Sequence, residues 1–227
     1  MPGERRHHRI SRSRTLPPSK IEVAIFLVGL TAAVIAGVVA YQIVGLYGDG
    51  PFASGYRRVI RDPEGGRTLL VHETRTESGV VRRVIDGTTL AEVRLDVDDD
   101  GREDTRVHVE GTQITRVDRD QDGDDRTDLW EYYDKEKRLL KTGFSLVNDG
   151  VLDAWAYRDS TGQITKIEVS TRRDGTVDRW EYYEDGQLAR VEQDRDRDRR
   201  VDRWQTYEGG ILIETAVDRN GDGEPDR

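Results

Sequence analysis

The chain has 227 residues and a net charge of −9, and 36% of its residues are charged against 34% that are apolar. This composition argues against one large hydrophobic core and favours short repeated units, or a bound ion, as the source of stability. The first 20 residues hold six basic residues and one acidic residue (+5), and the remainder holds 30 basic and 44 acidic residues (−14). The negative charge of the larger part disfavours binding of nucleic acid. The absence of cysteine excludes disulfides and thiolate metal sites.

The N-terminal segment predicts a membrane anchor. Residues 1–20 are arginine-rich and contain two prolines, so we expect a disordered basic tail. Residues 21–44 are predicted to form a transmembrane helix, because positions 23–40 contain no charged residue and a helix of that length reaches roughly the 30 Å hydrocarbon thickness. The basic tail keeps the N-terminus in the cytoplasm and places the C-terminal part in the periplasm or outside the cell.

A cleaved signal peptide is the alternative for this segment. Val38 and Ala40 match the small-residue pattern of a cleavage site, and the C-terminal part would then be secreted. Residues 45–54, with Gly48, Gly50 and Pro51, are expected to be a flexible linker.

Residues 55–227 repeat with a period of 24 or 25. The four tryptophans stand at 130, 155, 180 and 204, and each follows an aspartate two positions earlier. After each Asp-x-Trp comes an alternating run, a turn such as Asp185-Gly186, and a second run, which is the signature of a β-hairpin. Two divergent copies open the series, with Arg57-Arg58-Val59-Ile60 and Arg82-Arg83-Val84-Ile85. We predict an all-β domain of tandem β-hairpins in an extended sheet or solenoid.

The tryptophans and tyrosines are expected to form the core of this sheet. In one hairpin, Trp180 and Tyr182 point to one face while Glu181 and Tyr183 point to the other. Packing of a sheet by these rings is favoured over an aromatic binding platform.

Aspartates recur with the same period at 104, 128, 153, 178, 202 and 226. Each of them is the last residue of a nine-residue loop, and the six loops are named I to VI in chain order. Four of them carry oxygen side chains at positions 1, 3, 5 and 9. These are loop I (Asp96, Asp98, Asp100, Asp104), loop II (Asp120, Asp122, Asp124, Asp128), loop V (Asp194, Asp196, Asp198, Asp202) and loop VI (Asp218, Asn220, Asp222, Asp226). Loops III (145–153) and IV (170–178) keep aspartate at positions 5 and 9 but have serine at position 1 and Val147 or Arg172 at position 3, so neither is expected to bind calcium well.

The chemistry of the four acidic loops favours calcium. Calcium takes 6 to 8 oxygen ligands in flexible geometry, whereas magnesium demands a stricter octahedron, and zinc or iron would need nearby histidine or cysteine. Position 6 is glycine in loops I and VI but Asp125 in loop II and Arg199 in loop V, and the arginine weakens the prediction for loop V. The rival interpretation is that acidic turns merely keep an open sheet soluble.

The loops resemble the Asp-x-Asp-x-Asp-Gly calcium loops of EF-hands, dockerins and thrombospondin type-3 repeats. The resemblance implies that the aspartates and Asn220 named above are calcium ligands. It departs from true EF-hands, because no helices flank the loops and a carboxylate at position 12 occurs only as Glu131 of loop II. The hairpins, with Trp-x-Tyr, a turn and a Leu or Ile strand, are similar to MORN-variant repeats, which form extended sheets in bacterial surface and immunity proteins.

These features predict a non-enzymatic, membrane-anchored, extracytoplasmic calcium-binding protein that serves as a structural or interaction module for another protein or a cell-envelope component. The alternative implied by the MORN-variant resemblance is an immunity or inhibitor module. A carboxylate-dependent hydrolase is disfavoured, because the acidic ladder suits metal binding better than acid–base work, and His72 and His108 lack a nucleophile in a recognisable motif.

Overall fold

The computed structural model describes residues 56–61, 66–77 and 79–226. The predicted basic tail, transmembrane helix and linker lie outside the described residues. Within the part of the chain that the structure describes, no helix has the length and apolar character needed to cross a membrane.

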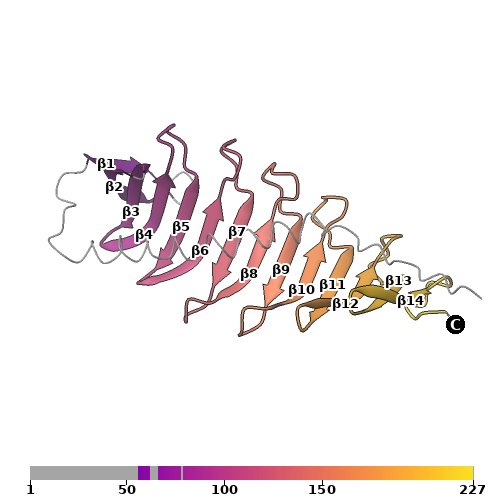
Figure 1. Ribbon diagram of the computed structural model, residues 1–227. Coiled ribbons are helices and arrows are strands. Elements are labelled where there is room, and N and C mark those ends of the chain that lie inside the picture. The colour runs from indigo at the N-terminus through magenta and orange to yellow at the C-terminus, as the bar shows by residue number, and fades with distance from the viewer. Residues whose placement is uncertain (1–55, 62–65, 78, 227) are drawn as a thin grey trace, which may run out of the picture. The chain divides into compact units, whose positions relative to one another are not determined.

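Fourteen antiparallel strands form one open sheet in chain order, each pairing with the next (Figure 1). This confirms the prediction of an all-β array of tandem hairpins. The strands are β1 (Tyr56–Arg61), β2 (Thr68–Thr76), β3 (Gly79–Asp86), β4 (Thr89–Asp96), β5 (Thr105–Glu110), β6 (Gln113–Arg119), β7 (Leu129–Tyr133), β8 (Leu139–Phe144), β9 (Ala154–Arg158), β10 (Ile164–Val169), β11 (Arg179–Glu184), β12 (Gln187–Gln193), β13 (Arg203–Glu208) and β14 (Ile211–Val217).

Two kinds of connection alternate along the sheet. Short turns join the two strands of each hairpin, as where Glu184 pairs with Gln187 across the two-residue turn Asp185-Gly186. Both turn residues are left-handed, with φ of 50° and 75°, which matches the type I′ turn that fits the twist of paired strands. Loops I to V join one hairpin to the next and therefore lie along the same edge of the sheet (Figure 1). The repeat thus places the acidic loops side by side.

The buried side chains lie on the face opposite the tryptophans, so the prediction of a Trp and Tyr core is wrong. Cross-strand neighbours on the buried face include Val93 with Val107 and Ile167 with Ala156, all at most 1% exposed. The four tryptophans are only half-buried. Strand alternation explains the result, because the small side chains between the aromatic ones turn to the other face.

Cations cover several rings on the aromatic face. Lys141 Nζ lies 4.7 Å from the ring centroid of Tyr132 and 4.4 Å from that of Trp155, and these two rings are 5.9 Å apart. Lys166 stacks over Tyr157 at 4.7 Å, and the guanidinium of Arg190 over Tyr182 at 4.3 Å. Such cation–π contacts stabilise the sheet by about 0.5–1 kcal/mol each at exposed sites. The aromatic residues therefore act as cross-strand braces.

We expect Gly143→Ala to destabilise this aromatic face. Gly143 on β8 lies beside Trp155, and a Cβ there would come within 2.7 Å of Leu152 Cδ1 and 3.1 Å of Trp155 Cζ3. Overpacking of this kind costs about 1–3 kcal/mol. Thermal unfolding followed by circular dichroism should show a lower Tm, and the penalty should shrink in a Leu152→Ala background, where the nearest obstructing atom is gone. An equal penalty in both backgrounds would contradict the packing argument.

Candidate metal centres

Loops I to VI share a left-handed backbone conformation at two positions. Position 4 is left-handed in each of them, at Asp99, Gly123, Asn148, Arg173, Arg197 and Gly221. Position 6 is left-handed as well, at Gly101, Asp125, Gly150, Gly175, Arg199 and Gly223. Arg199 and Asp125 therefore adopt the conformation that glycine provides elsewhere. The arginine at position 6 does not remove loop V from the set, contrary to the concern raised by its sequence.

Carboxylates hold each acidic loop closed. In all six loops the position-9 aspartate accepts the backbone N–H of position 2, as Asp128 does from Gln121 at 2.9 Å. In loops I, II, V and VI the position-1 aspartate also accepts the N–H of position 6, as Asp120 does from Asp125 at 2.7 Å. The position-9 aspartates of loops II and V accept through Oδ2 alone, which leaves Oδ1 for a ligand. At position 1, both oxygens of Asp120, Asp194 and Asp218 accept backbone N–H groups.

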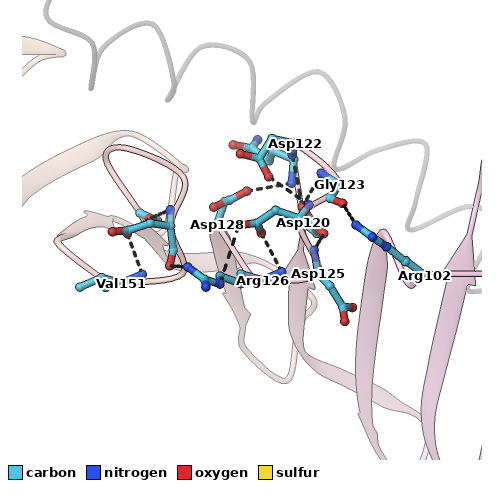
Figure 2. A network of polar contacts seen from close by, with 12 residues as sticks. Arg102, Asp120, Asp122, Gly123, Asp125, Arg126, Asp128 and Val151 are labelled. Atoms are coloured by element: carbon cyan, nitrogen blue, oxygen red, sulfur yellow. Dashed lines mark hydrogen bonds and ion pairs between the residues drawn. The ribbon is translucent and has the colours of Figure 1, made fainter.

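The structure brings together three carboxylates in each of three loops. Positions 1, 3 and 9 converge, with one ligand oxygen from each residue lying within 4.8 Å of the others, in the clusters Asp96, Asp98 and Asp104, then Asp120, Asp122 and Asp128, then Asp194, Asp196 and Asp202. Figure 2 shows the cluster of loop II, with Asp120, Asp122 and Asp128 grouped within the loop. These clusters could hold a metal ion.

The position-5 aspartates lie outside the three clusters. Asp100, Asp124 and Asp198 each accept the backbone N–H of the arginine two residues later, at 2.8, 2.9 and 2.8 Å. This is an Asx-type turn that shapes the last part of the loop. The sequence ladder of positions 1, 3 and 5 therefore becomes a cluster of positions 1, 3 and 9 in space.

Loops I, II and III each contain a buried carboxylate oxygen without a hydrogen-bond partner, in Asp96, Asp128 and Asp153. Asp96 is 0% exposed and Asp128 is 1% exposed, and Oδ1 of each is unpartnered. Burial raises the pKa of Asp128, and repulsion from Asp122, Asp120 and Asp124 adds to the effect. An unsatisfied buried carboxylate among like charges is costly, and a bound cation removes both penalties.

The carboxylates of loop I are paired with arginine to a greater extent than those of loop II. Asp96 Oδ2 already lies 3.3 Å from Arg82 Nη2, so part of the negative charge in loop I is paired within the protein. In loop II the cation nearest the acidic residues is Arg126, whose Nε is 3.8 Å from Asp124, outside the cluster. Loop II therefore combines convergent carboxylates with an arginine ion pair that lies outside the cluster.

Loop VI arranges its groups differently. The Asn220 amide donates to Asp222 Oδ2 at 3.0 Å and to Asp226 Oδ1 at 3.2 Å, so an N–H group points at both carboxylates. Backbone N–H groups, that of Gly223 first, lower the pKa of Asp218. Internal donors thus satisfy much of this loop.

Glu131, the carboxylate at position 12, does not join loop II. It is 0% exposed on β7 and pairs with Arg119 on β6 at 2.9 Å, on the buried face of the sheet. The sequence shows its spacing from Asp120 but does not reveal that strand alternation turns its side chain into the core.

Arginines at position 7 link neighbouring loops, a feature that the sequence reasoning missed. Arg102 Nη1 donates to the carbonyl oxygen of Gly123 in the next loop at 2.6 Å (Figure 2). Arg126 reaches Asp149 O at 3.3 Å, and Arg200 reaches Gly221 O at 3.1 Å. The recurrence of arginine at position 7 of loops I, II and V was the available signal.

Comparison with known proteins gives partial structural similarity alone. No family model and no curated protein matches the chain. The crystal structure of TarM is similar over 46% of this chain and 20% of its own, with 11% identity and a TM-score of 0.37. A structure of accessory secretory proteins 1, 2 and 3 of Streptococcus pneumoniae is similar over 59% of this chain and 23% of its own, with 16% identity and a TM-score of 0.25. The matched regions span less than a quarter of each of the two neighbouring chains and assign no activity to this chain.

Proposed function

We propose that this chain is a non-enzymatic calcium-binding repeat protein, in which loops I, II and V each hold one ion. The observation that carries the proposal is the carboxylate cluster of loop II, where Asp128 is buried with one unpartnered oxygen among Asp120 and Asp122. Binding stabilises the compact form of each loop and stiffens the edge of the sheet along which the loops lie.

Calcium suits these clusters better than other divalent ions. The ligands are carboxylates on flexible loops, supplemented by backbone carbonyls and water, which is the hard oxygen environment that calcium prefers. Magnesium retains its waters and needs a more regular octahedron. Within the three clusters neither histidine nor cysteine contributes a ligand, which disfavours zinc.

The array is proposed to act outside the cytoplasm as a structural or protein-interaction module, anchored through residues 21–44. An open sheet of repeated hairpins offers an extended surface, and calcium replaces the disulfides that this cysteine-free chain lacks. An immunity or inhibitor module of the MORN-variant type is the second candidate. A carboxylate hydrolase is disfavoured, since His108 is engaged with Asp118 at 2.8 Å in a network that includes Arg116.

Calorimetric titration tests the calcium assignment. Chelator-stripped full chain titrated with CaCl₂ should bind three ions, and MgCl₂ should bind more weakly. Asp122→Asn should remove one site, because it deletes a cluster carboxylate without changing side-chain volume. The matched control Asp174→Asn, in loop IV, should leave the stoichiometry unchanged. Zero heat with calcium, or equal loss in both variants, would contradict the proposal.

A further inference from the structure

We infer that arginine side chains serve as built-in cations for loops III and IV, so that each of loops I to V holds a cation. The cation is a metal ion in loops I, II and V and a guanidinium in loops III and IV. The inference rests on the proposed function for the metal loops, whereas the part that concerns the arginines stands on their own contacts.

Loop III keeps two of its carboxylates, and Arg173 holds both. Arg173 is position 4 of loop IV, and its Nε donates to Asp153 Oδ2 at 3.0 Å while its Nη2 pairs with Asp149 Oδ2. The Asp153 side chain is fully buried, so a charge on it requires a partner. In loop II the corresponding positions are Asp124 and Asp128. Arg126 Nε lies 3.8 Å from Asp124, and among the described residues no arginine forms an ion pair with Asp128.

The electrostatic state of the two loops differs accordingly. Arg173 holds the pKa of Asp149 below its usual range, with a further contribution from the Val151 N–H. In loop II the arginine contact reaches Asp124 alone, at 3.8 Å from Arg126. Loop III therefore has a counter-charge on its buried position-9 aspartate, whereas loop II has none among the described residues.

The distribution of arginine at position 4 follows the loss of ligands. Loops III and IV have Ser145 and Ser170 at position 1, and each is followed by a loop with arginine at position 4, Arg173 and Arg197. Arg197 lies 3.8 Å from Asp174 of loop IV, which repeats the contact of Arg173 with Asp149 in a longer form. The loops that follow the clustered loops I, II and V have Gly123, Asn148 and Gly221 there.

Backbone conformation makes this distribution informative. Position 4 is left-handed in every loop, with φ of 59° at Arg173 and 75° at Arg197. Long side chains rarely occupy this region, whereas glycine and asparagine do so readily. The two arginines therefore stand where the backbone disfavours them, and a carboxylate contact is what each gains.

The first test needs no metal. Arg173→Asn keeps a residue that tolerates the left-handed conformation, as Asn148 does in loop III. In EDTA, we expect this variant of the full chain to lose about 2–4 °C in Tm. The matched control is Arg172→Asn, which removes a neighbouring arginine that bonds the Arg195 carbonyl and no carboxylate. Equal Tm losses in the two variants would overturn the inference, whether or not the wild-type protein binds calcium.

The second test adds a metal site. S145D/V147D restores positions 1 and 3 of loop III but keeps Arg173, and it should bind no additional calcium. S145D/V147D/R173N should bind one ion more than the wild-type chain by calorimetry. An extra ion in the first variant, or none in a triple variant that retains its circular dichroism spectrum, would overturn the inference. If the triple variant does not fold, the Tm comparison of Arg173→Asn with Arg172→Asn in EDTA tests the inference. Absence of calcium binding by the wild-type chain would instead remove the proposed function.

Discussion

An Arg119→Met variant should lose about 3 kcal/mol of unfolding free energy, the lower end of the cost of stranding one partner of a buried ion pair. Arg119 is 8% exposed and donates to Glu131, which is 0% exposed on the core face of the sheet. Methionine fills the volume of the arginine stem but leaves the Glu131 carboxylate buried without its cation.

Two neighbours keep the expected cost near that lower end. Burial and the Glu131 charge raise the pKa of Tyr133, whose hydroxyl bonds to Glu131, so Tyr133 remains a neutral donor. Burial lowers the pKa of Arg158, and Glu131 partly offsets that effect, so a second guanidinium lies within electrostatic reach of the carboxylate. Neither replaces the bond from Arg119 at 2.9 Å.

Thermal unfolding followed by tryptophan fluorescence measures the loss. With about 2–4 °C per kcal/mol for a chain of this size, Tm should fall by about 6–12 °C. Arg119→Met/Glu131→Leu should recover most of the stability, because a packed apolar pair removes the stranded charge. Arg138→Met is the surface control. Arg138 pairs with Asp134 at 2.7 Å while 53% exposed, so its loss should lower Tm much less than the loss of Arg119. A similar Tm for Arg119→Met and Arg138→Met would refute the buried-pair argument.

The hairpin order could be read from the sequence because every element of it is local. Alternating runs, Asp-Gly turns and a 24 to 25 residue period each act over a few neighbours, and strands linked by short connections pair in chain order. The sequence did not show which face of the sheet is buried, because burial depends on contacts between strands. Arg119, Glu131 and Thr142 belong to the buried stripe, and a hydrophobic-pattern argument assigns such residues to solvent. The ion pair of Arg119 with Glu131 compensates the polarity of these two residues, and that pair exists only in the folded sheet.

The acidic loops show the same division between local and long-range information. Spacing alone identified positions 1, 3, 5 and 9, and the left-handed residues at positions 4 and 6 give all six loops the fold that this alignment implies. Spacing could not show that Asp124 turns away to accept the N–H of Arg126, or that Arg173 neutralises a loop 20 to 24 residues earlier. Those outcomes depend on how the loops lie against one another along the sheet edge.

Chelation of calcium should produce the largest stability change in this protein. One site at a free calcium concentration of about 100 times its Kd contributes about 2.7 kcal/mol, and three independent sites together contribute about 8 kcal/mol. Differential scanning calorimetry of the full chain should therefore show a large fall in Tm when calcium is replaced by EDTA, with magnesium restoring only part of it. An unchanged Tm would rule out calcium as the stabiliser.

Hydrogen exchange measured loop by loop, with calcium and with EDTA, should distinguish the loops that bind metal from those that an arginine neutralises. A quasi-one-dimensional array allows each repeat to respond mainly with its neighbours. Hydrogen exchange should therefore rise in EDTA at loops I, II and V, whose clusters lose their ion, and change less at loop III, where Arg173 still pairs with Asp149 and Asp153. In Asp122→Asn the rise should centre on loop II and extend to loop III, because Arg126 bonds the Asp149 carbonyl. An equal increase in hydrogen exchange at loops I to V in EDTA would contradict the distinction between metal-binding loops and arginine-neutralised loops.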